Sequence, residues 1–186
     1  VIGQMMEKVE LGEIKPRRTA EEIREQCPWA LTGKTSDRHR NIITSLALDP
    51  NVQERTNIRL QEKHKAIQEN EVRYTTYMVE DAEYLIVAYG SMSRICEAAV
   101  DQAREAGYKV GLLRPVTLFP YPEKQICDLV PQLKGILTVE MSAGQMVEDV
   151  RLAVNGKVPV EFFGRNGGIV PSPDEVYEAF VKLFNK

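Results

Sequence analysis

Short apolar runs alternate with segments of helical apolar spacing from residue 83 to the end of the chain. This alternation is typical of a parallel sheet whose strands are connected by helices. The predicted strands are 84–89, 109–114, 135–140 and 158–163, and the predicted helices follow Gly90 and Pro122, span 145–154 and begin after Ser172. The sequence therefore predicts an α/β domain with four parallel strands.

Three of the predicted helices carry an apolar stripe at steps of three and four residues. The stripes are Ile95, Ala98, Ala99 and Ala103; Met146, Val150, Ala153 and Val154; and Val176, Phe180, Val181 and Phe184. Gly107 is expected to end the first helix, and Asn155 with Gly156 the second. Ser172 and Glu175 have the spacing of a capping box for the last helix.

A fifth strand is predicted for residues 72–79, which are rich in Val, Thr and Tyr. Only about four residues separate it from the strand at Tyr84, whereas a parallel crossover needs roughly a dozen. These two strands can therefore pair only in antiparallel orientation. The expected fold is a three-layer α/β/α arrangement around a five-stranded, mostly parallel sheet with one antiparallel strand.

Residues 1–71 differ from the rest because turn residues break them and they show no sustained apolar period. The exception is 52–71, where one long polar helix is predicted with Ile58, Leu60 and Ile67 as sparse apolar anchors. We interpret residues 1–71 as an arm and linker that packs against another body. Residues 72–186 are then the α/β domain.

The composition is that of a globular chain, with 43% hydrophobic and 27% charged residues among 186. The net charge of −3 argues against nucleic-acid binding, and no apolar run approaches the roughly 20 residues that span a membrane. The cysteines Cys27, Cys96 and Cys127 are too far apart in sequence for a redox pair or a cluster ligand set, and the two histidines complete no familiar metal site. A reducing, cytoplasmic setting fits this cysteine usage best.

Two turns follow predicted strands at the place where open α/β sheets bind ligands. The turn Gly90-Ser91-Met92-Ser93 can bind an anion, but ordinary capping of the next helix by Ser91 or Ser93 is the favoured interpretation. In the turn from Glu140 to Gln145, Glu140 is a candidate general base. The sequence places no histidine, cysteine or second acid beside it, so a polar contact to a neighbouring domain is preferred.

Two glycine-containing segments resemble phosphate-binding loops only in part. Residues 164–168 lack the G-x-G-x-x-G spacing of a dinucleotide site, and loop flexibility explains their glycines better. Residues 32–35 end like a P-loop, but Pro28 stands where the first glycine belongs and no strand precedes it. The P-loop is therefore rejected.

Seven segments together resemble one enzyme family. They are VIGQMMEKVEL at 1–11, PWALTG at 28–33, RNIITSLALDP at 40–50, EVRY at 71–74, AYGSMSRI at 88–95, VGLLRPVTLFPYP at 110–122 and VEMSAGQMVEDVRLAVNGK at 139–157. This set resembles the 2-oxoacid:ferredoxin oxidoreductases, and within them the thiamine-site subunit of the 2-oxoisovalerate (3-methyl-2-oxobutanoate) type. The last two segments are specific to this group.

The resemblance implies oxidative decarboxylation of a 2-oxoacid to an acyl-coenzyme A. In the complete enzyme it implies thiamine diphosphate with Mg, iron–sulfur clusters, ferredoxin as electron acceptor and further subunits. It also implies a transketolase C-terminal-like domain, placed after a pyrimidine-type domain. The Y-P-I-T-P segment, the G-D-G…N thiamine-diphosphate motif and the cluster cysteines of that family are missing here, and residues 1–10 show neither a leader nor a Met start. We therefore expect the C-terminal portion of the subunit, with no catalytic residue and no bound cofactor of its own.

The turns at the strand ends are expected to lie on one edge and to face the missing domains or an anion. The residues of this edge are Gly90, Ser91, Ser93, Arg114, Glu140, Gly144 and Gln145. Unpaired N–H groups at Ser91, Ser93 and Gln145, with the Arg114 cation, would give the edge positive character. The alternative is a free-standing flavodoxin-like or nucleotide-binding module, and a homodimer stays open.

Overall fold

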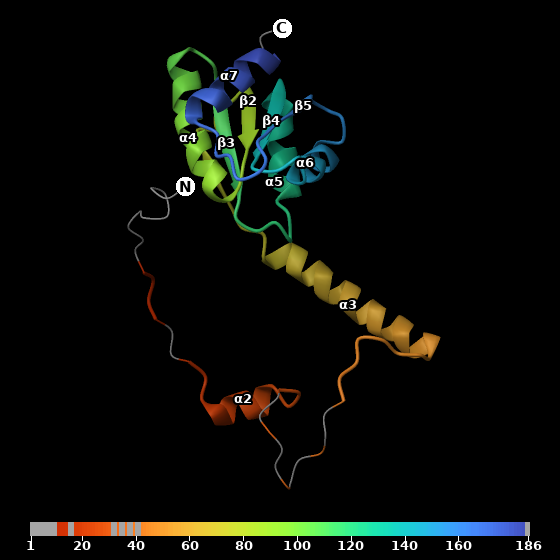
Figure 1. Ribbon diagram of the computed structural model, residues 1–186. Coiled ribbons are helices and arrows are strands. Elements are labelled where there is room, and N and C mark those ends of the chain that lie inside the picture. Colours follow the sequence, from red (N-terminus) through yellow and green to blue (C-terminus); the bar gives the residue numbers. More distant parts are fainter. Residues whose placement is uncertain are drawn as a thin grey trace. The chain divides into compact units, whose positions relative to one another are not determined.

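The computed structural model describes residues 11–14, 17–30, 33, 36, 39 and 42–184 (Figure 1). The chain divides into two compact units, with the boundary between Lys63 and His64. The rejected P-loop segment falls almost wholly outside the described residues, since only its Gly33 is among them.

The N-terminal part contains a short helix that the sequence pattern does not reveal. Helix α2, Ala20–Gln26, begins at a capping box in which the Glu22 N–H donates to Thr19 Oγ1 at 3.2 Å. The Thr19 N–H donates back to the Glu22 carboxylate at 2.7 Å. Seven residues are too few to establish an apolar period, so here only the capping residues carry a signal.

The long polar helix is confirmed as α3, Pro50–Asn70, which begins two residues earlier than predicted. None of its residues is buried, and two of the three predicted anchors, Ile58 and Leu60, are exposed. A helix that is polar all round gains little from packing within its own chain. The interpretation of residues 1–71 as an arm stays a prediction.

The sheet has five strands in the order β1-β3-β2-β4-β5. They are β1 Tyr74–Tyr77, β2 Tyr84–Val87, β3 Val110–Pro115, β4 Gly135–Glu140 and β5 Val160–Gly164. Strand β1 pairs antiparallel with β3, and every other pair is parallel. The helices are α4 Gly90–Glu105, α5 Glu123–Leu129 with the 3₁₀ turn Val130–Gln132, α6 Met146–Val154 and α7 Pro173–Phe184. The predicted mixed sheet is confirmed.

Helices cover both faces of the sheet, which gives the predicted three layers (Figure 1). On one face Ile86, Leu112 and Leu137 pack with α4 and α7. On the other face Leu85, Leu113 and Ile136 pack with α5 and α6. Because successive side chains of a strand point to opposite faces, strands covered on both sides read as continuous apolar runs.

The partner of β1 differs from the prediction, which paired it with the strand at Tyr84. The structure places β1 beside β3 instead, with Thr75 opposite Arg114. Strand β2 is buried along Leu85–Val87 and takes a central position between two parallel neighbours, whereas β1 is mostly exposed and suits the edge. The short connection fixed the orientation of β1 but not its neighbour.

The predicted helix ends are confirmed. Gly107 and Asn155 have positive φ values of 91° and 49° just after α4 and α6, as left-handed helix ends do. At α7 the Glu175 N–H donates to Ser172 Oγ, and the Ser172 N–H donates to the Glu175 carboxylate. One predicted core residue, Ala98, is exposed, because Cys96 and Val100 complete the buried face of α4.

Candidate functional site

The carboxyl ends of β3, β2 and β4 meet at one edge of the sheet, because these three strands are neighbours and parallel. The segments at this edge are Gly90–Ser93 at the start of α4, Arg114–Thr117 at the end of β3 and Glu140–Gln145 at the end of β4. The topology therefore brings the predicted turns together at the edge where open α/β sheets carry their sites.

Glu140 lies at this edge but points into the chain. It has no exposed surface, and its carboxylate accepts from the N–H groups of Gln145, Met146 and Val147 at 3.0–3.2 Å. The Ser142 hydroxyl donates to the same carboxylate at 3.1 Å. These bonds occupy the acceptors of Glu140, so it has the position of a helix cap rather than of a general base or a contact to a neighbouring domain.

The N–H group of Gln145, expected to be unpaired, is thus used within the chain. The turn that permits this contains Gly144, which has φ 105° and donates its N–H to Ser142 Oγ at 3.1 Å. A Cβ at Gly144 would lie 3.2 Å from Val147 Cγ1, in addition to the strain of a positive φ. Glycine at this position lets the chain curl back so that the start of α6 covers the carboxylate.

Acidic side chains surround the start of α6, since its first turn contains Glu148 and Asp149. Burial raises the pKa of the Asp149 carboxyl, and the nearby carboxylates of Glu148 and Glu140 raise it further. An anion would meet these like charges, so the start of α6 does not suit an anionic ligand.

The start of α4 is not capped by Ser91 or Ser93, as the sequence analysis favoured. The helix begins at Gly90, which has φ 58°, and its N-cap residue Tyr89 makes no side-chain capping bond. Ser93 lies inside the first turn and donates its hydroxyl to the Gly90 carbonyl at 2.7 Å. Neither Ser91 nor Ser93 is therefore the cap, and the first turn carries no acid.

Two buried donor atoms near this edge have no hydrogen-bond acceptor among the described residues, namely Arg114 Nε and the Tyr121 hydroxyl. Burial raises the pKa of the Tyr121 phenol, and the carboxylates of Asp149, Glu140 and Glu123 raise it further. Buried polar atoms in native proteins nearly always have a partner. Both donors are thus buried without an acceptor among the described residues.

The loop after β3 presents apolar side chains that the sequence analysis did not single out. Val116, Leu118 and Phe119 are 52%, 50% and 62% exposed. Thr117 holds this loop, because its hydroxyl donates to the Pro120 carbonyl at 2.8 Å and accepts from the Arg73 N–H at 3.0 Å. We call Arg114, Val116, Leu118 and Phe119 the edge patch.

Contacts within the chain hold the glycine-containing loop 164–168, so loop flexibility is not needed to explain its glycines. The Arg165 guanidinium pairs with the Glu175 carboxylate, and the Arg165 N–H donates to the Glu140 carbonyl at 3.2 Å. Gly167 and Gly168 have positive φ values of 68° and 84°, so glycine serves the turn itself.

The described residues offer no group of three or more His, Cys, Asp or Glu side chains that could hold a metal ion. Cys96 is buried in the core, which raises the pKa of its thiol, and the Cys127 thiol donates to the Ala153 carbonyl at 3.0 Å. Within the same part of the chain no helix is both long and apolar enough to cross a membrane.

Comparison with protein families matches residues 82–176 to the family described as pyruvate:ferredoxin oxidoreductase core domain II. The chain is 47% identical over 168 residues to the ketoisovalerate oxidoreductase subunit VorB of Methanothermobacter marburgensis, which covers 90% of this chain and 46% of that subunit. It is 34% identical over 97 residues to the 2-oxoglutarate synthase subunit KorA of the same organism, covering 52% of this chain and 26% of that subunit. The chain thus spans about half the length, or less, of these curated relatives.

Solved structures share the fold at low sequence identity. A 2-oxoglutarate:ferredoxin oxidoreductase from Magnetococcus marinus, with 2-oxoglutarate, coenzyme A and succinyl-CoA bound, matches with a TM-score of 0.59 at 15% identity. The match covers 73% of this chain and 24% of that one. A split-gene transketolase, an inactive beta4 tetramer, matches with a TM-score of 0.52 at 18% identity, over 61% of this chain and 41% of that one. Both support the predicted transketolase C-terminal-like fold.

Proposed function

Because the chain belongs to the pyruvate:ferredoxin oxidoreductase core domain II family, we propose that it is the C-terminal portion of a 2-oxoacid:ferredoxin oxidoreductase subunit. The complete enzyme would convert a 2-oxoacid and coenzyme A to acyl-coenzyme A and CO₂, with the electrons passing to ferredoxin. The observation that carries this proposal is the 47% identity to a ketoisovalerate oxidoreductase subunit over 90% of the chain.

The proposed substrate is 2-oxoisovalerate. The two ketoisovalerate relatives are 47% and 45% identical over 168 residues, whereas the 2-oxoglutarate relative from the same organism as the first is 34% identical over 97 residues. The wider and stronger likeness favours a branched 2-oxoacid. The partners would be other subunits of the enzyme, ferredoxin, coenzyme A and the 2-oxoacid, in the cytoplasm.

Thiamine diphosphate, Mg and the iron–sulfur clusters would belong to other parts of the complete enzyme. The described residues do not fit an iron–sulfur cluster, because Cys96 is buried in the core and the Cys127 thiol donates a hydrogen bond to a backbone carbonyl. At the edge, Glu140 covers the N–H groups of α6 and acidic side chains surround them, which does not suit a diphosphate. We therefore assign this chain a structural and assembly role.

The sheet edge would dock against the missing half of the enzyme. Gly90, Ser91 and Arg114 would be docking residues, together with the exposed apolar side chains of the edge patch. Ser93 is buried and bonded to the Gly90 carbonyl, so it would support the start of α4 from within. Glu140, Gly144 and Gln145 support the edge from within, since their contacts hold the turn before α6. Residues 72–186 would be the docked domain, and residues 1–71, with the unburied helix α3, the arm that leads to it.

Co-expression with the remaining parts of the enzyme tests the function. We expect coenzyme A-dependent reduction of ferredoxin, fastest with 2-oxoisovalerate in a series of branched and linear 2-oxoacids. Preference for a linear or acidic 2-oxoacid would contradict the substrate assignment and leave the family assignment intact. A chain that never associates with those parts would contradict the proposed role.

The isolated chain is expected to bind no thiamine diphosphate and to decarboxylate no 2-oxoisovalerate, because it would lack the diphosphate and pyrimidine contacts. A ligand at a hundredfold excess over its Kd stabilises a protein by about 2.7 kcal/mol, so thermal unfolding is a sensitive measurement. We expect no shift with thiamine diphosphate and Mg. A shift of that size with a nucleotide or flavin would favour the free-standing module instead.

Substitution of the edge patch should weaken assembly without unfolding the domain. Arg114→Ala is expected to weaken assembly by about 1 to 3 kcal/mol, the usual loss for a charged hydrogen bond. Leu118→Asp is expected to do so more strongly, because it would place an unpaired charge in the docked interface. The matched control is Leu152→Asp on α6, since Leu152 is 71% exposed and lies outside the patch. Equal loss of assembly in both Leu→Asp variants would refute the docking edge.

A further inference from the structure

Residues 42–48 of the arm are an uncharged stretch whose large apolar side chains are exposed. Its sequence is Ile-Ile-Thr-Ser-Leu-Ala-Leu, and it contains no Asp, Glu, Lys or Arg. The side chains of Ile42, Ile43, Leu46 and Leu48 are between 65% and 93% exposed. Adjoining apolar side chains on a protein surface usually mark an interaction site. We call residues 42–48 the apolar segment.

The apolar segment has the alternation of a strand but no strand partner. In an extended chain Ile42, Leu46 and Leu48 would lie on one side, with Ile43 and Ser45 on the other. The structure assigns the segment to no helix or strand. The backbone groups of its first five residues have no hydrogen-bond partner within the described part of the chain. Such unpaired backbone groups beside an apolar side are what a segment uses when it adds to the open edge of another sheet.

The start of α3 holds the C-terminal end of the apolar segment. Asp49 caps this helix, because its side-chain Oδ1 accepts from the Asn51 N–H at 2.8 Å and its carbonyl accepts from the Gln53 N–H at 3.0 Å. The Ala47 N–H donates to the side-chain oxygen of Gln53 at 2.9 Å. The segment is thus tied to a helix at one end, so it would lose less conformational entropy on docking than a chain without these bonds.

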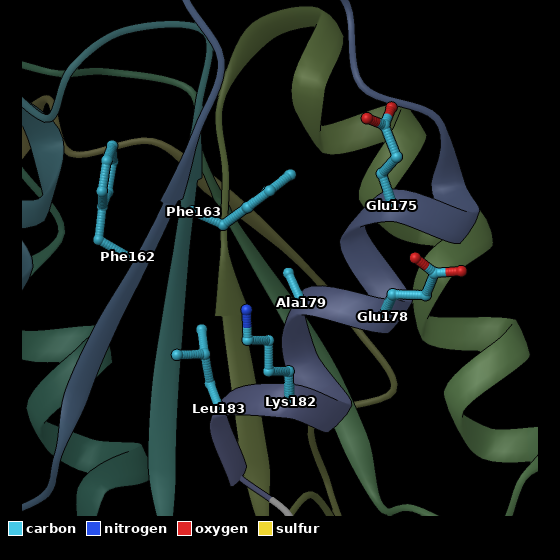
Figure 2. A pocket seen from close by; sticks show the side chains of 7 residues that line it. All are labelled: Phe162, Phe163, Glu175, Glu178, Ala179, Lys182 and Leu183. Atoms are coloured by element: carbon cyan, nitrogen blue, oxygen red, sulfur yellow. The ribbon is translucent and has the colours of Figure 1, made fainter.

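The groove on the α/β domain does not suit the apolar segment. This groove of about 380 Å³ lies between β5 and α7, and its apolar lining includes Phe163 and Leu183 (Figure 2). Figure 2 shows Glu178 and Lys182 on the α7 side of the groove, where both are exposed. An uncharged segment lying there would take two charges out of water without offering either an opposite charge. The chemistry of the groove therefore favours a partner outside the α/β domain.

The similarity to known subunits separates the arm from the α/β domain. The match to the ketoisovalerate subunit covers 90% of the chain, so it includes most of the arm, which is more than a third of the chain. The match to the 2-oxoglutarate subunit of the same organism covers 52%, and the family model matches only residues 82–176. The organism that holds both subunits must keep two assemblies apart, and discrimination needs a surface that differs between them. The arm is such a surface.

We propose that the apolar segment selects the ketoisovalerate-type enzyme, by adding a strand to an open sheet edge in the part of that enzyme which this chain lacks. This inference rests on the proposed function, because it takes the chain to be a portion of such an enzyme. The partner edge would adjoin an uncharged apolar surface, since the segment offers no charge to pair with another. The edge patch would dock the domain in either enzyme type, and the apolar segment would discriminate between them.

Co-expression with the remaining parts of a ketoisovalerate-type enzyme, and separately with those of a 2-oxoglutarate-type enzyme, tests the selection. The wild-type chain should retain the first set at least about tenfold better than the second in affinity purification. Leu46→Asp should lower retention of the first set about tenfold or more, because it places a charge on the apolar side. Ser45→Asp is the matched control, since it adds the same charge on the other side of the segment. Leu46→Met keeps an apolar side chain of similar size and should keep retention.

The outcomes distinguish this inference from the proposed function. A wild-type chain that retains neither set would overturn both. Equal retention of the two sets would overturn the selection and leave the proposed function intact. So would a Leu46→Asp chain that is retained like the wild type, or a Ser45→Asp chain that is lost equally. Unchanged thermal unfolding of the variants would show that the α/β domain stays folded.

Hydrogen exchange tests the strand addition itself. The amides of residues 42–46 should exchange fast in the isolated chain and slowly in the assembled ketoisovalerate-type enzyme, because their N–H groups would then be paired. Slow exchange already in the isolated chain would mean that the chain covers the segment itself. Fast exchange in both would mean that no strand is added. Either result would overturn the proposal.

Discussion

Glu140→Ala is expected to lower the free energy of unfolding by about 3 to 5 kcal/mol, because each buried donor left without an acceptor costs about 1 to 3 kcal/mol. The carboxylate accepts from the N–H groups of Met146 at 3.1 Å and Val147 at 3.0 Å, both buried, and from Gln145 at 3.2 Å. Alanine supplies no acceptor, and the helix start is too well covered for water to replace it. Unfolding by urea, followed by circular dichroism, measures the loss.

Two variants separate the lost acceptor from a general effect at this turn. Glu140→Gln keeps the size of the side chain but sets an NH₂ group against backbone donors, so an intermediate loss is expected. Glu148→Ala removes a carboxylate from the first turn of the same helix, where it is exposed, and should cost no more than about 1 kcal/mol. If Glu140→Ala cost no more than Glu148→Ala, the carboxylate would not be the cap that its contacts indicate.

The central strands could be predicted from sequence because burial on both faces leaves a continuous apolar run. Strand β4 begins and ends where it was predicted, and all six of its residues are buried. Strand β5 lies one to two residues later than predicted and is only half-buried, because it is an edge strand with an open side. Edge position weakens the apolar pattern, and the boundary becomes harder to place.

The neighbour of β1 could not be predicted from loop length alone. The connection between β1 and β2 is short enough to suggest a hairpin, yet Gly111 of β3 comes so close to Met78 and Val79 that a Cβ would lie 2.7 Å from the Met78 carbonyl oxygen. This glycine lets the segment after β1 cross beside β3. In the sequence, Gly111 is the only sign of this close approach, and a glycine within a strand has other common explanations, such as a bulge.

The site was predictable in its place but not in its contacts. The carboxyl ends of neighbouring parallel strands share an edge whatever their side chains are, so the three turns could be assigned together. The bonds of Glu140 depend on a left-handed Gly144 that turns the chain back over the carboxylate, and a separation of five to seven residues gives no periodic signal. The exposure of Leu118 and Phe119 could not be predicted either, because apolar residues near the end of a strand are usually buried in the core.

Phe180→Ala is expected to lower the free energy of unfolding by about 3 to 5 kcal/mol, the usual loss for a buried Phe truncated to Ala. Phe180 is 1% exposed, and its ring centroid lies 5.3 Å from that of Tyr84 and 5.5 Å from that of Tyr108. Both contacts are edge-on, and the Phe184 ring lies 5.4 Å away on the same helix. Truncation would leave a cavity between α7 and the sheet that three rings cannot close without losing these contacts.

Phe119→Ala is the matched control for this truncation, because it removes the same side chain from a position that is 62% exposed. Phe119 has an edge-on ring contact with His64 at 5.9 Å, so its loss should cost less than about 1 kcal/mol. The two variants differ in burial and not in chemistry, so the difference between their urea midpoints at unchanged slope measures what burial against the sheet contributes. Equal losses would mean that α7 is not held by this aromatic cluster.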